Sequence, residues 1–187
     1  MTAAGHLFSL QGIDSTTMEQ IAAEADVAKG TLYSHFPAKE AIIESLVQQR
    51  FRDRHQLRLD RLHNLPDTRA RLVLVLGELM EGVRSQPDLF EKYLASRIRT
   101  VVSLRPQEST GSGLRLLAAE IIRLGQRGGE VRTDLPDELL CDLFEFVFVE
   151  AAKPFYLAPG EFDAAASISR SADLFLRATR PDPAGSD

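Results

Sequence analysis

The side chains best suited to chemistry lie in one short segment, KGTLYSH, at residues 29–35. Five of its residues can donate a hydrogen bond, and Gly30 leaves room for another backbone to come close. Donors of this kind contact the phosphate oxygens and base edges of nucleic acids. We expect base-edge contacts from Lys29, Thr31, Ser34 and His35, and phosphate contacts from Thr17, Tyr33 and Lys39.

Two short helices joined by a tight turn are predicted to position these donors. Thr16 lies three residues before Glu19, the spacing of a capping box, and apolar residues at helical spacing follow. A second helix is expected over residues 29–35, with Leu32 on its buried side, and it ends before Pro37. Such a pair forms a helix-turn-helix, whose second helix enters the major groove of DNA.

At these residues the chain resembles the tetracycline-repressor (TetR) family of transcription regulators. The resemblance rests on LFSLQG at 7–12 and STTMEQIAAEADVAKGTLYSHFPAKEAI at 15–42. Ala28 departs from the family pattern, which has a capping serine or threonine there. The chain also begins inside the family's first helix, so we expect the native protein to extend beyond Met1. The resemblance implies backbone contacts from Thr17, Tyr33 and Lys39, and a recognition face made of Lys29, Gly30, Thr31, Ser34 and His35.

The whole chain is expected to be all-α. An N-terminal three-helix DNA-binding domain at 1–46 would precede a helical ligand-binding and dimerisation domain at 47–180 and a disordered tail at 181–187. One long helix is predicted from Ala38 to about His63. The apolar run 139–157 contains FEFVFV, which could form a strand, but its length favours a helix. Other helices are predicted at 1–11, 68–86, from 87 to about 102, 114–126 and 161–178, with a mobile polar loop at 105–113.

Two further sites are predicted in the second domain. The last two helices are expected to pair with those of a second copy, because a helix as apolar as 139–157 must bury more than one face. The resemblance implies a small-molecule pocket, for which core packing remains the alternative reading of each lining residue. Arg97 could bind an acidic ligand or pair with Glu145 or Glu150. The candidate lining residues are Tyr93, Arg97, Cys141, Phe144, Phe148 and Tyr156.

Composition narrows the remaining possibilities. The 187 residues carry a net charge of −5, which argues against non-specific binding of polyanions. The single cysteine excludes an intramolecular disulfide, and we find no apolar run long enough to span a bilayer, so we expect a cytoplasmic protein. No metal-ligand spacing, cofactor motif or catalytic arrangement is recognisable. We therefore expect a ligand-responsive DNA-binding regulator, and not an enzyme; the alternative is a helix-turn-helix adaptor that binds proteins without binding DNA.

Overall fold

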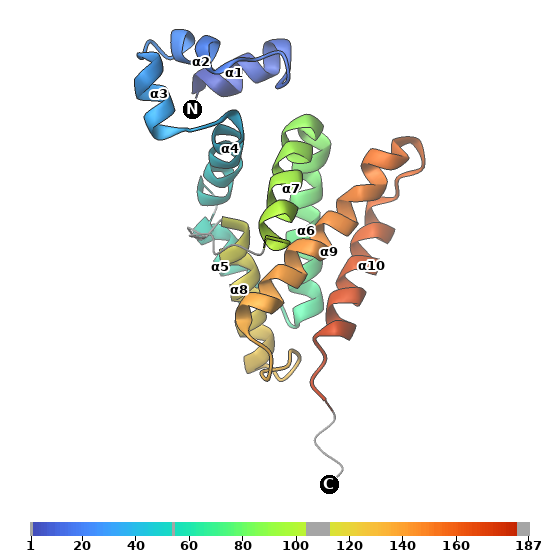
Figure 1. The fold of residues 1–187 in the computed structure, drawn as a ribbon. Coiled ribbons are helices and arrows are strands. Elements are labelled where there is room, and N and C mark those ends of the chain that lie inside the picture. Colours follow the sequence, from blue (N-terminus) through green and yellow to red (C-terminus); the bar gives the residue numbers. More distant parts are fainter. Residues whose placement is uncertain (1, 54, 104–112, 183–187) are drawn as a thin grey trace.

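The computed structural model describes residues 2–53, 55–103 and 113–182, and these ranges contain ten α-helices, one short 3-10 helix and no strand. The prediction of an all-helical chain is confirmed. Figure 1 shows α1–α3 gathered at one end, with α4 leading from them into a body of packed helices. The helices are α1 (Thr2–Gln11), α2 (Met18–Glu24), α3 (Lys29–His35), α4 (Lys39–Asp53), α5 (His55–His63), α6 (Thr68–Ser85), α7 (Pro87–Val101), α8 (Gly113–Arg127), α9 (Asp137–Leu157), η1 (Pro159–Glu161) and α10 (Ala164–Ala178).

The N-terminal unit, which comprises α1–α3 and the start of α4, has a small core of its own. Each of its helices contributes to that core, and the shortness of α2 and α3 makes this burial essential to their stability. Gly12 ends α1 with a φ of +81°, a conformation that glycine adopts without strain. The buried residues of this core are Ala4, Met18, Ile21, Ala22, Leu32 and Ile42.

The capping box of α2 lies one residue later than the sequence suggested. The Thr17 hydroxyl accepts the Gln20 amide at 3.2 Å, and the Gln20 side chain accepts the Thr17 amide at 2.8 Å. The Thr16 hydroxyl is buried and donates to the carbonyl of Gly12 at 2.7 Å. The prediction of a Thr16–Glu19 box was wrong because two adjacent threonines compete for the cap, and the burial of Thr16 decides between them.

The predicted single helix from Ala38 to His63 is described as two helices, α4 and α5; residue 54 between them lies outside the described residues. The Arg58 guanidinium donates to the carbonyl oxygen of Phe51 at 3.2 Å, which satisfies an acceptor at the C-terminal end of α4. Arg71 from α6 likewise donates to the carbonyls of Leu62 and Leu65, just at and beyond the end of α5. Carbonyls near the C-terminal ends of α4 and α5 therefore accept hydrogen bonds from an arginine of the following helix.

The body is built around α6 and α9. Asp67 caps α6 through the Ala70 amide at 2.7 Å. The apolar run at 139–157 is helical, so the strand reading of FEFVFV is excluded. α6 and α7 pack so closely at Gly82 that a Cβ there would lie 2.5 Å from the Phe90 ring.

The last helix begins later than predicted. α10 starts at Ala164, after the Asp163 cap and the separate 3-10 helix η1, rather than at Glu161. Most of the predicted polar loop at 105–113 and most of the predicted disordered tail, residues 183–187, lie outside the described residues.

Candidate DNA interface and effector cavity

α3 lies at one side of the N-terminal unit, between α2 and α4 in the chain (Figure 1), and its polar residues are exposed to solvent. Leu32 is buried against the core of the unit, while Tyr33 is 38% exposed. The structure therefore brings the donors predicted in this helix together on one accessible surface. The exposed residues of α3 are Lys29, Gly30, Thr31, Tyr33, Ser34 and His35.

Lys29 is held by two neighbours in the DNA-free protein. Its ammonium pairs with the Glu19 carboxylate on α2 and lies 5.7 Å from the centre of the Tyr33 ring. The hydrogen bond to Glu19 raises the pKa of Lys29, and the same bond lowers the pKa of Glu19. Glu19 engages one of the three donors of the Lys29 ammonium, and contact of Lys29 with a base edge stays a prediction.

Two other predicted DNA contacts also have intramolecular partners. The Ser34 hydroxyl donates to the Thr31 carbonyl at 2.8 Å, so its oxygen remains accessible only as an acceptor. Both the hydroxyl and the amide of Thr17 take part in the capping box with Gln20. Thr17 remains exposed at the start of α2 despite these bonds. Contact of Ser34 and Thr17 with DNA stays a prediction.

Lys39, a predicted phosphate contact, also makes hydrogen bonds within the protein. Its ammonium donates to the carbonyls of Ile13 at 2.6 Å, Thr16 at 2.8 Å and Asp14 at 3.4 Å. The side chain therefore joins the start of α4 to the loop between α1 and α2. No local sequence pattern indicates this role, because the acceptors lie more than twenty residues away.

We expect Lys39→Met to lower the free energy of unfolding by about 1–3 kcal/mol, because three carbonyls lose a charged donor. Urea unfolding at fixed protein concentration measures this effect. If the variant keeps its stability, and the slope of log K for DNA binding against log salt concentration falls by about one, Lys39 instead contacts phosphate alone.

The six residues predicted to line a ligand pocket lie mainly in the core. Tyr93, Phe144 and Phe148 are fully buried, and Cys141 is 4% exposed. The Tyr156 hydroxyl donates to the Pro87 carbonyl at 2.9 Å, which joins the end of α9 to the start of α7. None of the six lines either of the two cavities described below. Their contact with a ligand stays a prediction that requires the core to open.

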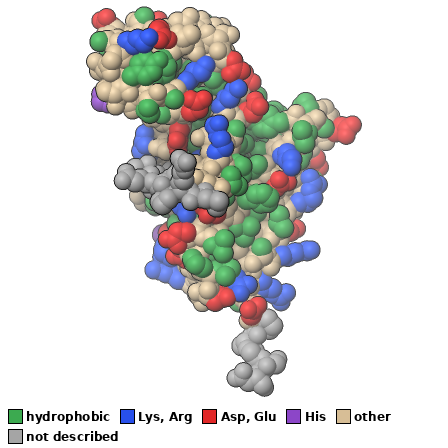
Figure 2. Space-filling model, viewed as in Figure 1, with side chains coloured by type: hydrophobic (Ala, Val, Ile, Leu, Met, Phe, Trp, Pro, Cys, Tyr) green, Lys and Arg blue, Asp and Glu red, His purple; other side chains and the backbone are tan. Residues whose placement is uncertain are grey.

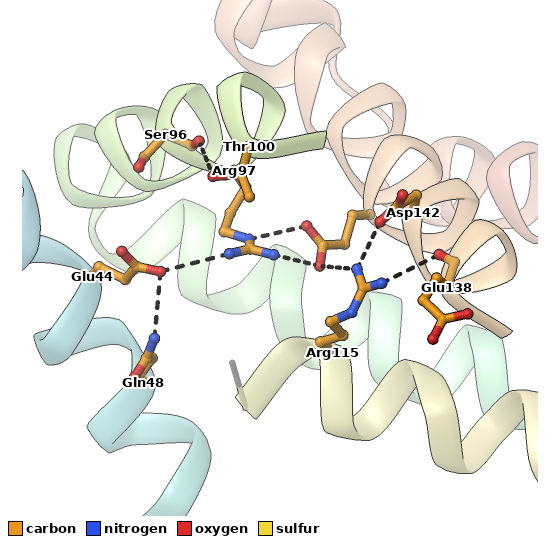
Figure 3. Close-up of polar contacts among 9 residues, drawn as sticks. Glu44, Gln48, Ser96, Arg97, Thr100, Arg115, Glu138 and Asp142 are labelled. Carbon is orange, nitrogen blue, oxygen red and sulfur yellow. Dashed lines mark hydrogen bonds and ion pairs between the residues drawn. The ribbon is translucent and has the colours of Figure 1, made fainter. Parts of the chain in front are cut away.

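Arg97 pairs with Glu145, which resolves the choice of protein partner left open by the sequence. The guanidinium donates to both carboxylate oxygens, at 2.9 and 2.7 Å, and Glu145 is only 1% exposed. Burial alone would lower the pKa of Arg97, but the bonds to Glu145 and its charge outweigh burial and raise that pKa. Figure 3 shows the pair extended by Glu44 of α4 on one side and Arg115 of α8 on the other.

The body contains a cavity of about 400 Å³ among α4, α5, α6, α7 and α8. Its apolar wall includes Phe51 and Phe90, and its polar wall includes Arg50, Glu78 and Glu81. Apolar walls with a few polar groups are typical of small-molecule sites. The sequence missed these residues because they come from helices far apart in the chain. The remaining lining residues are Val47, Asp53, Arg58, Val75, Leu79, Gly82, Ser85 and Leu117.

A second cavity, of about 610 Å³, separates the N-terminal unit from the corner between α6 and α7. Phe8 and Leu46 line it on one side, and the start of α7 at Pro87 lines it on the other. Arg50 and Ser85 belong to the walls of both cavities, so the two spaces adjoin.

Cys141 is expected to be unreactive in the folded protein. Burial raises the pKa of its thiol to about 11, while the nearby Arg115 charge acts in the opposite direction. Relative to an ordinary thiol of pKa 9.0, the thiolate fraction at pH 8 falls about 100-fold, and reaction with a thiol reagent should slow accordingly. The rate with a chromogenic disulfide, measured with and without urea, checks this; fast stoichiometric labelling of the native protein would contradict it.

Hydrophobic side chains gather on the outer surface of the body. Figure 2 shows them along the course of α9. On α9 these include Leu139 at 51% exposed, Phe146 at 45% and Leu157 at 74%, and α10 adds Leu174 at 47%. An apolar surface of this kind usually marks a protein contact.

Neither a membrane-spanning helix nor a metal site is found among the described residues. Of the helices that the structure describes, none combines the length and apolar character needed to cross a bilayer. Within the same residues, no group of three or more histidine, cysteine or acidic side chains could hold a metal ion.

Comparison with known proteins matches residues 1–46 to the family of bacterial regulatory proteins named after tetR. Among curated proteins, the chain is 27% identical to the transcriptional regulator UidR of Escherichia coli K12 over 147 residues, which cover 79% of this chain and 60% of UidR. It is 26% identical to the repressor KstR2 of Mycolicibacterium smegmatis over 141 residues, which cover 73% of this chain and 68% of KstR2.

The fold of the chain also matches solved structures. The Thermus thermophilus repressor FadR, solved in complex with lauroyl-CoA, superposes with a TM-score of 0.74 at 24% identity, covering all of this chain and 97% of FadR. The chain spans about 60% of the length of UidR.

Proposed function

We propose that this protein is a ligand-responsive transcription regulator, most simply a repressor that a small molecule releases from a palindromic operator in the cytoplasm. The observation that carries the proposal is the exposed donor surface of α3, on an N-terminal unit that matches the tetR family over residues 1–46. Base-edge contacts would come from Lys29, Thr31, Ser34 and His35, with Gly30 close to the DNA. Phosphate contacts would come from Thr17, Tyr33 and Lys39.

A homodimer supplies the second recognition helix. The exposed apolar residues of α9 and α10 support pairing through these two helices. A stable interface of this kind buries roughly 1,000 Å² or more. Two-fold symmetry then places half-sites about one turn, ~34 Å, apart or slightly further.

The body cavity among α4–α8 is the proposed effector site. Its polar and apolar walls suit an amphipathic molecule, and α4 belongs both to its wall and to the core of the N-terminal unit. An effector that binds better when the two α3 helices are wrongly spaced for adjacent major grooves shifts the population toward that state. Effector and operator then weaken each other by equal coupling free energies.

Operator selection from random duplexes, followed by fluorescence anisotropy, tests the DNA-binding function. We expect one enriched near-palindrome, and an affinity that falls by a kcal/mol or more in Lys29→Ala or Tyr33→Ala. The absence of any enriched sequence would favour the adaptor alternative.

A thermal-shift screen tests the effector. A ligand present at 100 times its Kd stabilises the protein by about 2.7 kcal/mol, so binding is readily detected. The screen should include lauroyl-CoA, with which FadR was solved. A binder that leaves operator affinity unchanged would contradict the coupling between the two sites.

A further inference from the structure

Glu19 is an acidic side chain on the surface that the proposed function assigns to DNA. It lies in the first turn of α2 and pairs with the ammonium of Lys29, the first residue of α3. Both side chains remain open to solvent, with Glu19 53% and Lys29 61% exposed. Because DNA is a polyanion, a carboxylate on this surface weakens binding unless it meets a hydrogen-bond donor of the DNA.

The position of Lys29 decides which part of the DNA this ion pair meets. In a helix-turn-helix, the first residues of the second helix contact base edges in the major groove. Lys29 begins α3, and α2 packs against α3 through a core that includes Ile21 and Leu32. Glu19 therefore approaches the same base edges as Lys29, since the ion pair holds its carboxylate beside the ammonium.

The donors and acceptors of the pair match the major-groove edge of one G·C base pair. The Lys29 ammonium has three donors, of which Glu19 engages one, so two remain for the O6 and N7 acceptors of guanine. The Glu19 carboxylate has further acceptor sites, and the N4 amino group of cytosine offers a donor directly beside guanine O6. An A·T pair has the adenine amino group where guanine has O6, so the ammonium loses an acceptor there.

We propose that Glu19 and Lys29 together recognise one G·C base pair of the operator, Lys29 through guanine and Glu19 through the N4 amino group of cytosine. The inference rests on the proposed function, because it requires α3 in the major groove. It adds a residue of α2 to the surface that determines sequence specificity. The competing role of Glu19 is to orient Lys29 without touching DNA, and in that role the carboxylate does not respond to the cytosine amino group.

N4-methylcytosine tests the contact, because its methyl group replaces the amino hydrogen that faces the major groove and leaves the hydrogen bond to guanine. The base pair is located first, in the operator selected from random duplexes, as the pair at which Lys29→Ala loses a preference for G·C. Anisotropy then compares cytosine with N4-methylcytosine at that pair, for the parent protein and for Glu19→Ala. We expect the methyl group to weaken binding of the parent by about fivefold or more, and binding of Glu19→Ala by less than about twofold.

Glu24→Ala is the matched control for the loss of charge. Glu24 is an exposed residue of the same helix, and its carboxylate pairs with His6 of α1 at 3.0 Å instead of with α3. The variant removes one negative charge from α2, as Glu19→Ala does, and should keep the full effect of the methyl group. Both variants should unfold close to the temperature of the parent, because exposed ion pairs contribute little to stability.

The results separate the cytosine contact from the regulator function. An equal methyl effect in the parent and in Glu19→Ala overturns the contact, while the regulator function stands because an operator is bound. In that case, weaker binding of both operators by Glu19→Ala shows that Glu19 only orients Lys29, and stronger binding of both shows that it only repels phosphates. An operator without a G·C pair that depends on Lys29 also overturns the contact alone. A selection that enriches no operator overturns the regulator function, and the contact with it.

Discussion

Glu145→Leu is expected to lower the free energy of unfolding by about 3–5 kcal/mol, because it leaves the Arg97 guanidinium buried without its main partner. Arg97 is only 6% exposed, and its next carboxylate, Glu44, lies 3.6 Å away, too far for a hydrogen bond. Urea unfolding at fixed protein concentration gives the loss directly. The control is Glu150→Leu, the same change on the same helix at an exposed ion pair, with an expected effect within about 0.5 kcal/mol.

Removing both charges is expected to recover most of that stability. In Arg97→Met/Glu145→Leu, neither a buried guanidinium nor a buried carboxylate remains to be desolvated, and replacing buried pairs with apolar groups is often neutral or stabilising. A double variant as unstable as Glu145→Leu alone would show that the pair contributes net stability. A stable double variant with a disturbed α4 orientation would instead mean that the pair is kept to position Glu44.

The sequence predicted helices most accurately where local chemistry ends them. α3 spans the predicted residues 29–35, since the turn before it and Pro37 after it leave little freedom. The predicted helix from Ala38 to His63 is described as α4 and α5, on either side of residue 54, which lies outside the described residues. The contacts of Arg58 and Arg71 with backbone carbonyls of these helices are tertiary, and no local pattern reveals them. The Thr16–Glu19 box failed for a related reason, since only burial distinguishes Thr16 from Thr17.

The DNA-binding surface on α3 could be predicted from local sequence, whereas the cavity among α4–α8 could not. The donors of α3 follow one another in seven residues, so their shared surface follows from helical geometry alone. The cavity walls combine α4, α5, α6, α7 and α8, and residues such as Arg50 and Ser85 become neighbours only after folding. Aromatic residues that the sequence assigned to a pocket, including Phe144 and Phe148, fill the core, which was the alternative reading of each.

Gly30→Glu is expected to weaken operator binding by about 3 kcal/mol or more, at least ~100-fold, because it places a carboxylate against DNA phosphates. Anisotropy with the selected operator measures this loss. Gly30 lies in the first turn of α3, at the centre of the proposed DNA-binding surface. Gly30→Ala, which adds only a methyl group, should cost much less.

The fold should tolerate this change, which makes the loss specific to DNA. A Cβ at Gly30 would have no atom within 4 Å, and glutamate has a higher helix propensity than glycine by roughly 0.5–1 kcal/mol. A carboxylate in the first turn also suits the helix dipole, and Ala28 provides no side-chain cap there. Gly30→Glu should therefore unfold at the same or a higher temperature while operator binding is lost. The matched control is Gly160→Glu, the same change at another exposed and open position far along the chain, which should keep full affinity. Retained operator affinity in a folded Gly30→Glu protein would show that α3 does not approach the DNA.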